Sequence, residues 1–506
     1  MESKRKFRNH FSVLLEDIGR VGWFIVVAAV MGILESLMGA EVEVEEAETL
    51  VEMESGDVLI GMAILIGVAL LIVLPIVWRI LVWSKTWITI DEQAIVIECN
   101  TILRQRKNTI AIKNISNINL EQNLFEMLIG TCKLKLDTNS LSTADSTDVK
   151  LVLKKKHAGE VQNYLLSRMH QINEEDIPGQ SEIVQPAPAQ KAAACAKAET
   201  GDIIRHGFLN ISIFGSVFSV GILAFLLTVG LLLPEDASDE MVGMSLVTIL
   251  WIAGMIFSFI WKIIKSFIRY LEFTIRRQGD RLMLDYGVMK KVSYSIPVDK
   301  IQAIRFKQTF LARVFKYYTA EVINVGMNDG DAEEQSFLLP YYKREKVEEI
   351  LRLLLPEFAD CMELREQRQP KAIWLIWLWP AFVYLLLMAV FAGVAAEFAA
   401  DMLPVVIVAI LALGGLLALY KLGTYLTNGS HMEGKFLMLV SGCMAREYLF
   451  VKYDKIQHIT LKQSFLAKSC GLVKGNIWLL ASTINRIHAI PYFKAEKAEL
   501  LKERIL

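Results

Sequence analysis

The sequence predicts a polytopic membrane protein in which membrane-spanning helical hairpins alternate with small soluble domains of α+β or all-β structure. Three observations lead to this fold class. Apolar residues make up 54% of the 506 residues and the mean hydropathy is positive, as is typical of membrane proteins. Six long apolar segments fall into three pairs, and one block of sequence recurs after each pair. Charged residues still make up 22% of the chain, so much of it is expected to fold in water.

The six apolar segments are each long enough to cross the hydrocarbon core, which takes about 20 helical residues. They are residues 19–40 with 58–83, 207–233 with 241–264, and 372–397 with 402–423. The loops inside the pairs are acidic, whereas Lys and Arg collect at the outer ends of the pairs. Because positive residues favour the cytoplasmic side, we predict a multi-pass protein of the inner (plasma) membrane, with both termini and all three soluble domains in the cytoplasm.

A repeated motif follows each hairpin. It reads VDKIQAIRFKQTFLAR from Val298, YDKIQHITLKQSFLAK from Tyr453 and, in a more diverged form, IKNISNINLEQNLFEM from Ile112. Two isoleucines and one glutamine recur at the same positions in the three copies: Ile115, Ile118 and Gln122; Ile301, Ile304 and Gln308; Ile456, Ile459 and Gln463. The isoleucines are expected in a bent core strand or bulge. The glutamine either fixes a turn by hydrogen bonds to the backbone or forms part of a binding rim.

Each copy is expected to contain several short strands and then one helix. Runs of β-branched and large apolar residues predict a first strand at 87–90, 272–275 and 436–440, and further strands at 109–112, 133–137 and 294–298. Apolar residues at helical spacing predict that each copy closes with an amphipathic helix. The apolar face of this helix is formed, in copies one to three, by Val161, Tyr164, Leu165 and Met169; Val347, Ile350, Leu351 and Leu354; and Leu500, Leu501 and Ile505. This order of elements predicts a small β-barrel or sandwich capped by a helix.

These elements divide the chain into seven segments. The hairpin segments are predicted at 1–83, 205–265 and 370–423, the soluble domains at 84–177, 266–369 and 424–506, and a linker at 178–204. The linker is rich in Ala, Gln and Pro and has no apolar period, so we expect it to be flexible.

No set of residues predicts catalysis or metal binding. The seven histidines are isolated, the six cysteines have no C-x-x-C spacing, and the sequence has no phosphate-binding loop and no nucleophile elbow. We therefore expect no enzyme, no metal and no cofactor, and cysteines that are reduced thiols. The net charge of −1 gives no indication of nucleic acid as a partner.

The hairpin, the strand-rich unit with a basic turn, and the motif D-K-I-Q-x-I-x-x-K-Q-x-F-L together resemble the bacterial membrane proteins with pleckstrin-homology-like domains, the YdbS/YdbT family. The three copies are similar to its longer, YdbT-like members. In copy one, Asn114 and Glu121 stand where the motif has lysine. The resemblance implies a pleckstrin-homology-like (PH-like) fold, a seven-stranded bent sheet closed at one end by a C-terminal helix, and it implies little about function.

Basic residues near the predicted membrane ends are the remaining candidates for a binding site: Arg104, Arg106, Lys107, Lys290, Lys291, Lys307, Lys343, Lys462 and Lys494. Near an anionic leaflet each contributes on the order of 1 kcal/mol of attraction, and the alternative is a solvated domain face. We expect a non-enzymatic scaffold that binds membrane lipids through anionic headgroups, or a membrane-protein partner of the same family such as a smaller paralogue. The alternative is a transporter or export component, against which the largely uncharged spans argue.

Overall fold

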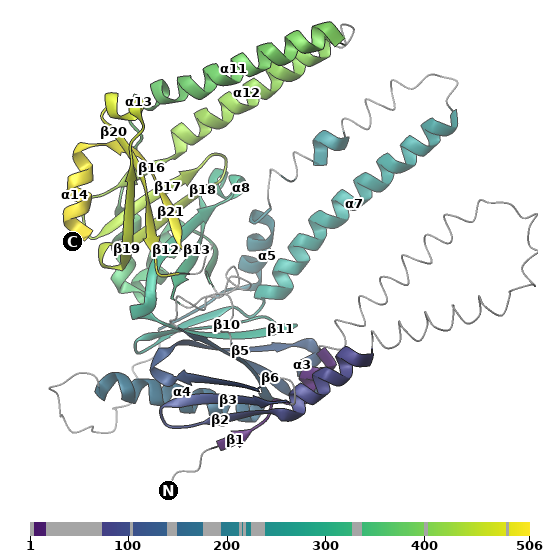
Figure 1. Ribbon diagram of the computed structural model, residues 1–506, viewed down its shortest axis with the longest axis vertical. Helices are drawn as coiled ribbons and strands as arrows, with labels where there is room; N and C mark the ends of the chain where they lie inside the picture. Colours follow the sequence, from purple (N-terminus) through teal and green to yellow (C-terminus); the bar gives the residue numbers. More distant parts are fainter. Residues whose placement is uncertain are drawn as a thin grey trace, which may run out of the picture. The chain divides into compact units, whose positions relative to one another are not determined.

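The computed structural model describes residues 5–16, 73–101, 105–138, 149–175, 194–211, 215, 219–223, 238–325, 336–398, 403–481 and 485–505 (Figure 1). The chain divides into two compact units, one made of Met1–Leu136 and Val149–Ile183, the other of Asp137–Asp148 and Val184–Leu506. The first unit holds copy one of the repeat, and the second holds copies two and three.

Copy one consists of four strands, then three strands, then a helix. The first sheet has the order β1-β2-β3-β4 and is formed by β1 (Arg5–Phe7), β2 (Thr86–Ile90), β3 (Ala94–Asn100) and β4 (Gln105–Ala111). The next strands are β5 (Ile115–Asn123), β6 (Thr131–Thr138) and β7 (Val149–Lys154), with α3 (Leu124–Ile129) between β5 and β6. The closing helix α4 (Lys155–Glu175) buries Val161, Leu165 and Met169 in the same core as Ile88 and Leu134.

Copy two repeats this order. Its first four strands are β8 (Cys195–Lys197), β9 (Thr274–Gln278), β10 (Arg281–Tyr286) and β11 (Lys290–Pro297). Its last three are β12 (Ile301–Gln308), β13 (Tyr317–Asn324) and β14 (Phe337–Lys343), with α8 (Phe310–Val314) after β12 and the closing helix α10 (Arg344–Leu354) after β14. Burial alternates along β10, where Leu282, Leu284 and Tyr286 face the core, as the twofold side-chain period of a strand requires.

Copy three has the same elements in the same order. Its first four strands are β15 (Gln367–Arg368), β16 (Gly429–His431), β17 (Phe436–Gly442) and β18 (Arg446–Lys452). Its last elements are β19 (Ile456–Lys462), α13 (Phe465–Ser469), β20 (Leu472–Leu479), β21 (Ile487–Lys494) and α14 (Glu496–Ile505). The strand predicted as the first of this copy, 436–440, is therefore the third, because β15 and β16 are too short and polar to give a pattern.

In the sequence, each predicted hairpin segment lies between the first and second strands of a PH-like domain, whereas the predicted order was hairpin and then domain. β1 pairs with β2, β8 pairs with β9, and β15 pairs with β16, although a hairpin segment separates the two strands of each pair. The predicted linker is wrong at its end for the same reason. Residues 195–197 pair as β8 with the sheet, and the helix α5 (Thr200–Leu209) follows.

Copies two and three share one sheet. β12 pairs with β18 antiparallel, with Ala303 opposite Val451 and Gln308 opposite Arg446. The result is a seven-stranded sheet in the order β14-β13-β12-β18-β17-β16-β15. Each of the two copies also contributes residues to the core of the other. Phe450 of copy three lies in the core of copy two, and Ala303 of copy two lies in the core of copy three.

Within the described residues, three helices are long and apolar enough to cross a membrane. They are α7 (Ser238–Tyr270), α11 (Ile373–Phe398) and α12 (Leu403–Thr427). Figure 1 shows α11 and α12 side by side, and the hydroxyl of Tyr384 on α11 donates to the carbonyl of Ile410 on α12 at 3.0 Å. The sequence predicts six spans; of the other three, 19–40 lies outside the described residues, and 58–83 and 207–233 lie largely outside them.

Candidate functional site

The repeated glutamine makes the same hydrogen bond in every copy. The side-chain amides of Gln122, Gln308 and Gln463 donate to the backbone carbonyls of the residues nine positions later, Thr131, Tyr317 and Leu472, at 2.7, 3.0 and 3.0 Å. Each bond spans the short helix α3, α8 or α13. This is the geometry of a residue that fixes a turn, the first of the two roles considered for it.

The repeated isoleucines lie at the start of the fifth strand of each copy. Ile115, Ile118, Ile301, Ile304 and Ile456 are buried, and Ile459 is half-buried. The pairing register shifts after Ile301 in β12 and after Ile456 in β19, which is the irregularity of a β-bulge. The isoleucines are thus placed as core residues of a bent strand.

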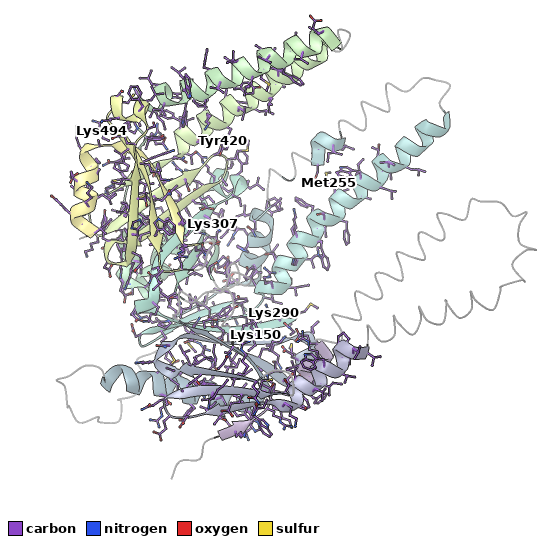
Figure 2. The ribbon with its side chains drawn as sticks, viewed as in Figure 1. Lys150, Met255, Lys290, Lys307, Tyr420 and Lys494 are labelled. Atoms are coloured by element: carbon purple, nitrogen blue, oxygen red, sulfur yellow. The ribbon has the colours of Figure 1, made fainter. Side chains whose placement is uncertain are left out.

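The described cations of the predicted binding surface lie on six different strands. Arg104 lies outside the described residues; Arg106 and Lys107 are on β4, Lys290 and Lys291 begin β11, and Lys307, Lys343, Lys462 and Lys494 are on β12, β14, β19 and β21. Figure 2 shows Lys290, Lys307 and Lys494 far apart on the second unit. Of the nine, Lys307 alone lines the cavity described next.

A cavity of about 450 Å³ lies beside the C-terminal turns of α7. It is formed by α5, the end of α7, strands β12, β13 and β14, and the turn into β18. Its polar lining includes four cations, two carboxylates and several neutral groups: Lys262, Lys265, Arg269, Lys307, Glu321, Glu447, His206, Asn210, Ser266, Gln308, Thr309, Thr319 and Tyr341. The cations outnumber the acids, so the cavity favours an anion.

Three of the four cations come from the last turns of α7. Lys262, Lys265 and Arg269 are spaced so that they share one side of the helix and line the cavity together. The fourth, Lys307, contacts Glu321 at 2.7 Å, and Arg305 contacts the other oxygen of Glu321 at 3.4 Å. Glu321 is therefore already neutralised by neighbouring cations.

His206 forms a neutral wall of the cavity. Its ring is 3% exposed and lies 5.1 to 5.3 Å, between centroids, from the rings of Tyr270, Phe337 and Tyr341. Burial lowers the pKa of His206 to about 3, so the imidazole is uncharged at neutral pH. Within the described part of the chain, its Nδ1 and the Oγ of Ser266 have no hydrogen-bond partner, which leaves two polar atoms for a bound group.

The helix α5 packs against both α7 and the PH-like domain of copy two. Asp202 contacts Arg205 on the same helix and Lys346 on α10, the latter at 3.3 Å. The hydroxyl of Thr309 donates to the carbonyl of Leu209. Gly207 lies so close to α7 that a Cβ there would be 3.2 Å from the carbonyl oxygen of Ile263. The cavity wall is thus held by contacts on both sides of α5.

The short helices of the repeat expose large apolar side chains. Leu128 after α3's first turn is 87% exposed, Phe315 at the end of α8 is 55% exposed, and Phe465 on α13 is 84% exposed. In the second unit, α13 contacts α11, and Arg313 on α8 donates to the carbonyl of Cys443 at 3.0 Å and to the hydroxyl of Thr427, the last residue of α12, at 3.4 Å. These apolar groups of copies two and three therefore lie beside the ends of the candidate spans.

Sequence reasoning missed the neutral half of the cavity. His206 is one of the seven histidines interpreted as isolated, and Asn210 falls within the predicted span 207–233. Their spacing of four nevertheless places them on one side of a helix. The three α7 cations were used only to orient the membrane. All six cysteines are free, and no group of three or more His, Cys, Asp or Glu side chains suited to a metal occurs within the described ranges.

Repeated PH-like domains joined to apolar helices define a class, membrane proteins with bacterial PH domains. The chain belongs to the bacterial PH domain family, whose model matches residues 24–169, 218–358 and 376–506. It is also similar to the UPF0699 transmembrane protein YdbT of Bacillus subtilis (strain 168), with 23% identity over 435 residues, 83% of either chain. No solved structure matches. These matches confirm the family predicted from the repeated motif and identify the protein as a membrane protein.

Proposed function

We propose that this protein is a non-enzymatic membrane scaffold whose PH-like domains bind anionic lipid headgroups at the inner membrane. The observation that carries the proposal is the cavity at the end of α7. Lys262, Lys265, Arg269 and Lys307 line it together with two polar atoms that have no hydrogen-bond partner among the described residues. The ligand chemistry is a phosphate, because amines and a guanidinium together with neutral donors suit its oxygens.

The position of the cavity favours a lipid as the source of that phosphate. Lys262, Lys265 and Arg269 belong to the last turns of a candidate span, Ser245–Tyr270, and cations at such ends lie at headgroup level. Each contributes on the order of 1 kcal/mol of attraction to an anionic leaflet. The exposed Phe315 and Phe465 beside the third hairpin support the same surface, since amphipathic segments bury such groups at the acyl boundary.

Lipid binding is tested by thermal unfolding of the purified full chain in neutral detergent. Three additions are compared: phosphatidylglycerol, phosphatidylcholine and inorganic phosphate. We expect phosphatidylglycerol to raise the unfolding temperature and the other two to leave it nearly unchanged. The double variant Lys262→Gln, Lys265→Gln should lose most of this shift. The matched control neutralises two exposed lysines outside the cavity, Lys343→Gln and Lys494→Gln, and should keep it.

The outcomes separate the possibilities. An equal effect of inorganic phosphate assigns the cavity to a soluble anion. A phosphatidylglycerol shift that is the same in the cavity variant and in the control variant removes the cavity from the proposal. Substrate flux in vesicles that depends on residues within the spans would favour a transporter instead.

The cytoplasmic orientation is tested with the exposed thiol of Cys195 on β8. In a variant that keeps this cysteine alone, an impermeant maleimide should label permeabilised cells and leave intact cells unlabelled. Labelling of intact cells would reverse the orientation.

A further inference from the structure

Among the described strands, the fifth strand of copy three is paired along one edge only. In copy two, β12 is paired on one side with β13 and on the other with β18. Its counterpart β19 pairs with β20 and has no hydrogen-bonded neighbour on its other side within the described residues. Such an edge presents a row of backbone N–H and C=O groups that can pair with another strand.

The side chains of β19 are correspondingly less covered. Ala303, Ile304 and Phe306 of β12 are fully buried. At the equivalent positions of β19, His458 is exposed, and Ile459 and Leu461 are half-buried at the margin of the core of copy three. The difference fits the absence of a strand like β18.

The pairing of β12 with β18 shows what kind of strand fits this edge. Across the pair, Phe450 lies opposite Ile304, Tyr448 opposite Phe306, and Glu447 opposite Lys307. The equivalents of these β12 residues are Ile459, Leu461 and Lys462. A fitting strand therefore carries two large apolar residues on one face and an acid opposite Lys462.

The charge at Lys462 strengthens the requirement for an acid. On β20 the residue directly opposite Lys462 is Lys474, whereas Lys307 in copy two lies opposite Thr319. Like charges directly across a strand pair are destabilising. A carboxylate on the other side of Lys462 would relieve this repulsion.

We propose that β19 is the docking edge for the fourth strand of a PH-like domain on a separate, non-identical polypeptide. The strand pairs antiparallel to β19, as β18 does with β12, and presents an acid to Lys462. The inference adds a partner to the proposed scaffold and is independent of lipid binding at the cavity.

The fourth strands of a second copy of this chain fit this edge poorly. In β4, Arg106 occupies the position of Glu447 and Lys107 that of Tyr448, so Arg106 would lie opposite Lys462. In β11 the position of the acid is taken by Val292. β18 is already paired with β12. Charge therefore favours a different chain over a homo-oligomer.

The strand specificity is tested by titrating the purified full chain with a fluorescent peptide of residues 444–453, which contains the β18 sequence, and recording anisotropy. We expect saturable binding that Lys462→Glu weakens about two- to fivefold, the usual range for one cross-strand pair. A peptide with Glu447→Lys should bind the Lys462→Glu variant better than the wild type. Lys468→Glu on α13 is the matched control and should leave binding unchanged.

No saturable binding, or binding that Lys462→Glu and Lys468→Glu affect equally, overturns the docking edge. Because Lys462 is exposed, the variant is expected to fold, which its unfolding temperature verifies. The cavity variant Lys262→Gln, Lys265→Gln should bind the peptide normally, so failure of the lipid proposal and failure of this one are distinguishable.

The occupant is tested in cells with a photo-crosslinking residue at Thr460 of the full chain. We expect an adduct to a different polypeptide, mapped to a strand with an acid at the position facing Lys462. An adduct between two copies of this chain overturns the assigned occupant, and an adduct to lipid alone overturns docking at this edge.

Discussion

One residue just beyond the short helix of each copy has a left-handed backbone. It is Gly130 with φ 78° in copy one, Lys316 with φ 58° in copy two and Gly471 with φ 62° in copy three. A side chain in this conformation costs roughly 1 to 2 kcal/mol, so copy two carries strain that the other copies avoid.

This position yields paired predictions of opposite sign. Lys316→Gly should stabilise the protein by about 1 kcal/mol and Gly471→Ala should destabilise it by a similar amount. A Cβ at Gly471 would meet no atom within 4 Å, so the backbone angle is the cause. The unfolding temperature, monitored by thiol labelling, measures both changes in stability. Gly159→Ala within α4 is the control, and its expected effect is stabilising because alanine favours helix.

His206 makes stability depend on pH. Its pKa is about 3 in the folded protein because it is buried, and about 6.5 in an unfolded chain. Below pH 6.5 the unfolded chain binds a proton that the folded protein cannot bind, so the free energy of unfolding decreases as the pH falls toward 3, by up to about 1.4 kcal/mol per pH unit.

Replacing His206 removes this dependence. Between pH 7.5 and pH 5, the wild type should lose about 2 kcal/mol more stability than His206→Phe. The measurement is the unfolding temperature at the two pH values. His157→Phe on the exposed side of α4 should behave like the wild type, and an equal pH dependence in all three proteins contradicts the assignment.

At the scale of elements, the crossing of α5 and α7 sets the cavity. A Cβ at Gly207 would lie 3.2 Å from the carbonyl oxygen of Ile263 and 3.4 Å from Cβ of Ser266, so a larger residue must push the helices apart. The cavity takes its lining from both helices, and its shape depends on this contact.

Gly207→Leu should therefore destabilise the protein by about 1 to 3 kcal/mol, the usual cost of overpacking, and should reduce the shift that phosphatidylglycerol produces. Gly201→Leu in the same helix is the matched control, because a Cβ there meets no atom within 4 Å. Thermal unfolding with and without the lipid measures both effects. If both variants behave alike, the close crossing is not what maintains the cavity.

At the scale of the whole molecule, copies two and three are joined by the β12–β18 pair and by exchanged core residues. Phe436 and Phe450 pack in the core of copy two, and Ala303 and Ile323 pack in that of copy three. Neither core is complete without residues of the other copy, so the two copies should unfold together.

Cooperativity of the two copies is tested with Ile477→Ala, which removes a fully buried side chain from copy three and should cost about 2 to 5 kcal/mol. The readout is the labelling of Cys361, which is buried in copy two, during heating. The variant should expose Cys361 at a lower temperature, in step with Cys470 of copy three. If Cys361 keeps its wild-type transition, the two copies are separate folding units.

Features that depend on local pattern could be predicted from the sequence alone. Each such feature lies within a short stretch of chain. Examples are the apolar runs long enough for a bilayer, the acidic and basic flanks of these runs, the motif present in three copies, and the helical spacing of Val347, Ile350, Leu351 and Leu354. For the same reason the motif identified the family. The motif also predicted the isoleucines as core residues, whereas it left the role of the glutamine open between a turn and a binding rim.

The way in which distant segments combine became visible only in the folded structure. β8 and β15 have three and two residues, too few for any pattern, yet their pairing puts the second and third predicted hairpin segments between two strands of a PH-like domain. The β12–β18 pair joins two copies, and the cavity combines Lys307, which the sequence suggested, with His206 and Ser266, which it did not. The physical reason is that strand pairing and cavity walls are contacts between residues far apart in the chain, whose free energy exists only once the fold brings them together.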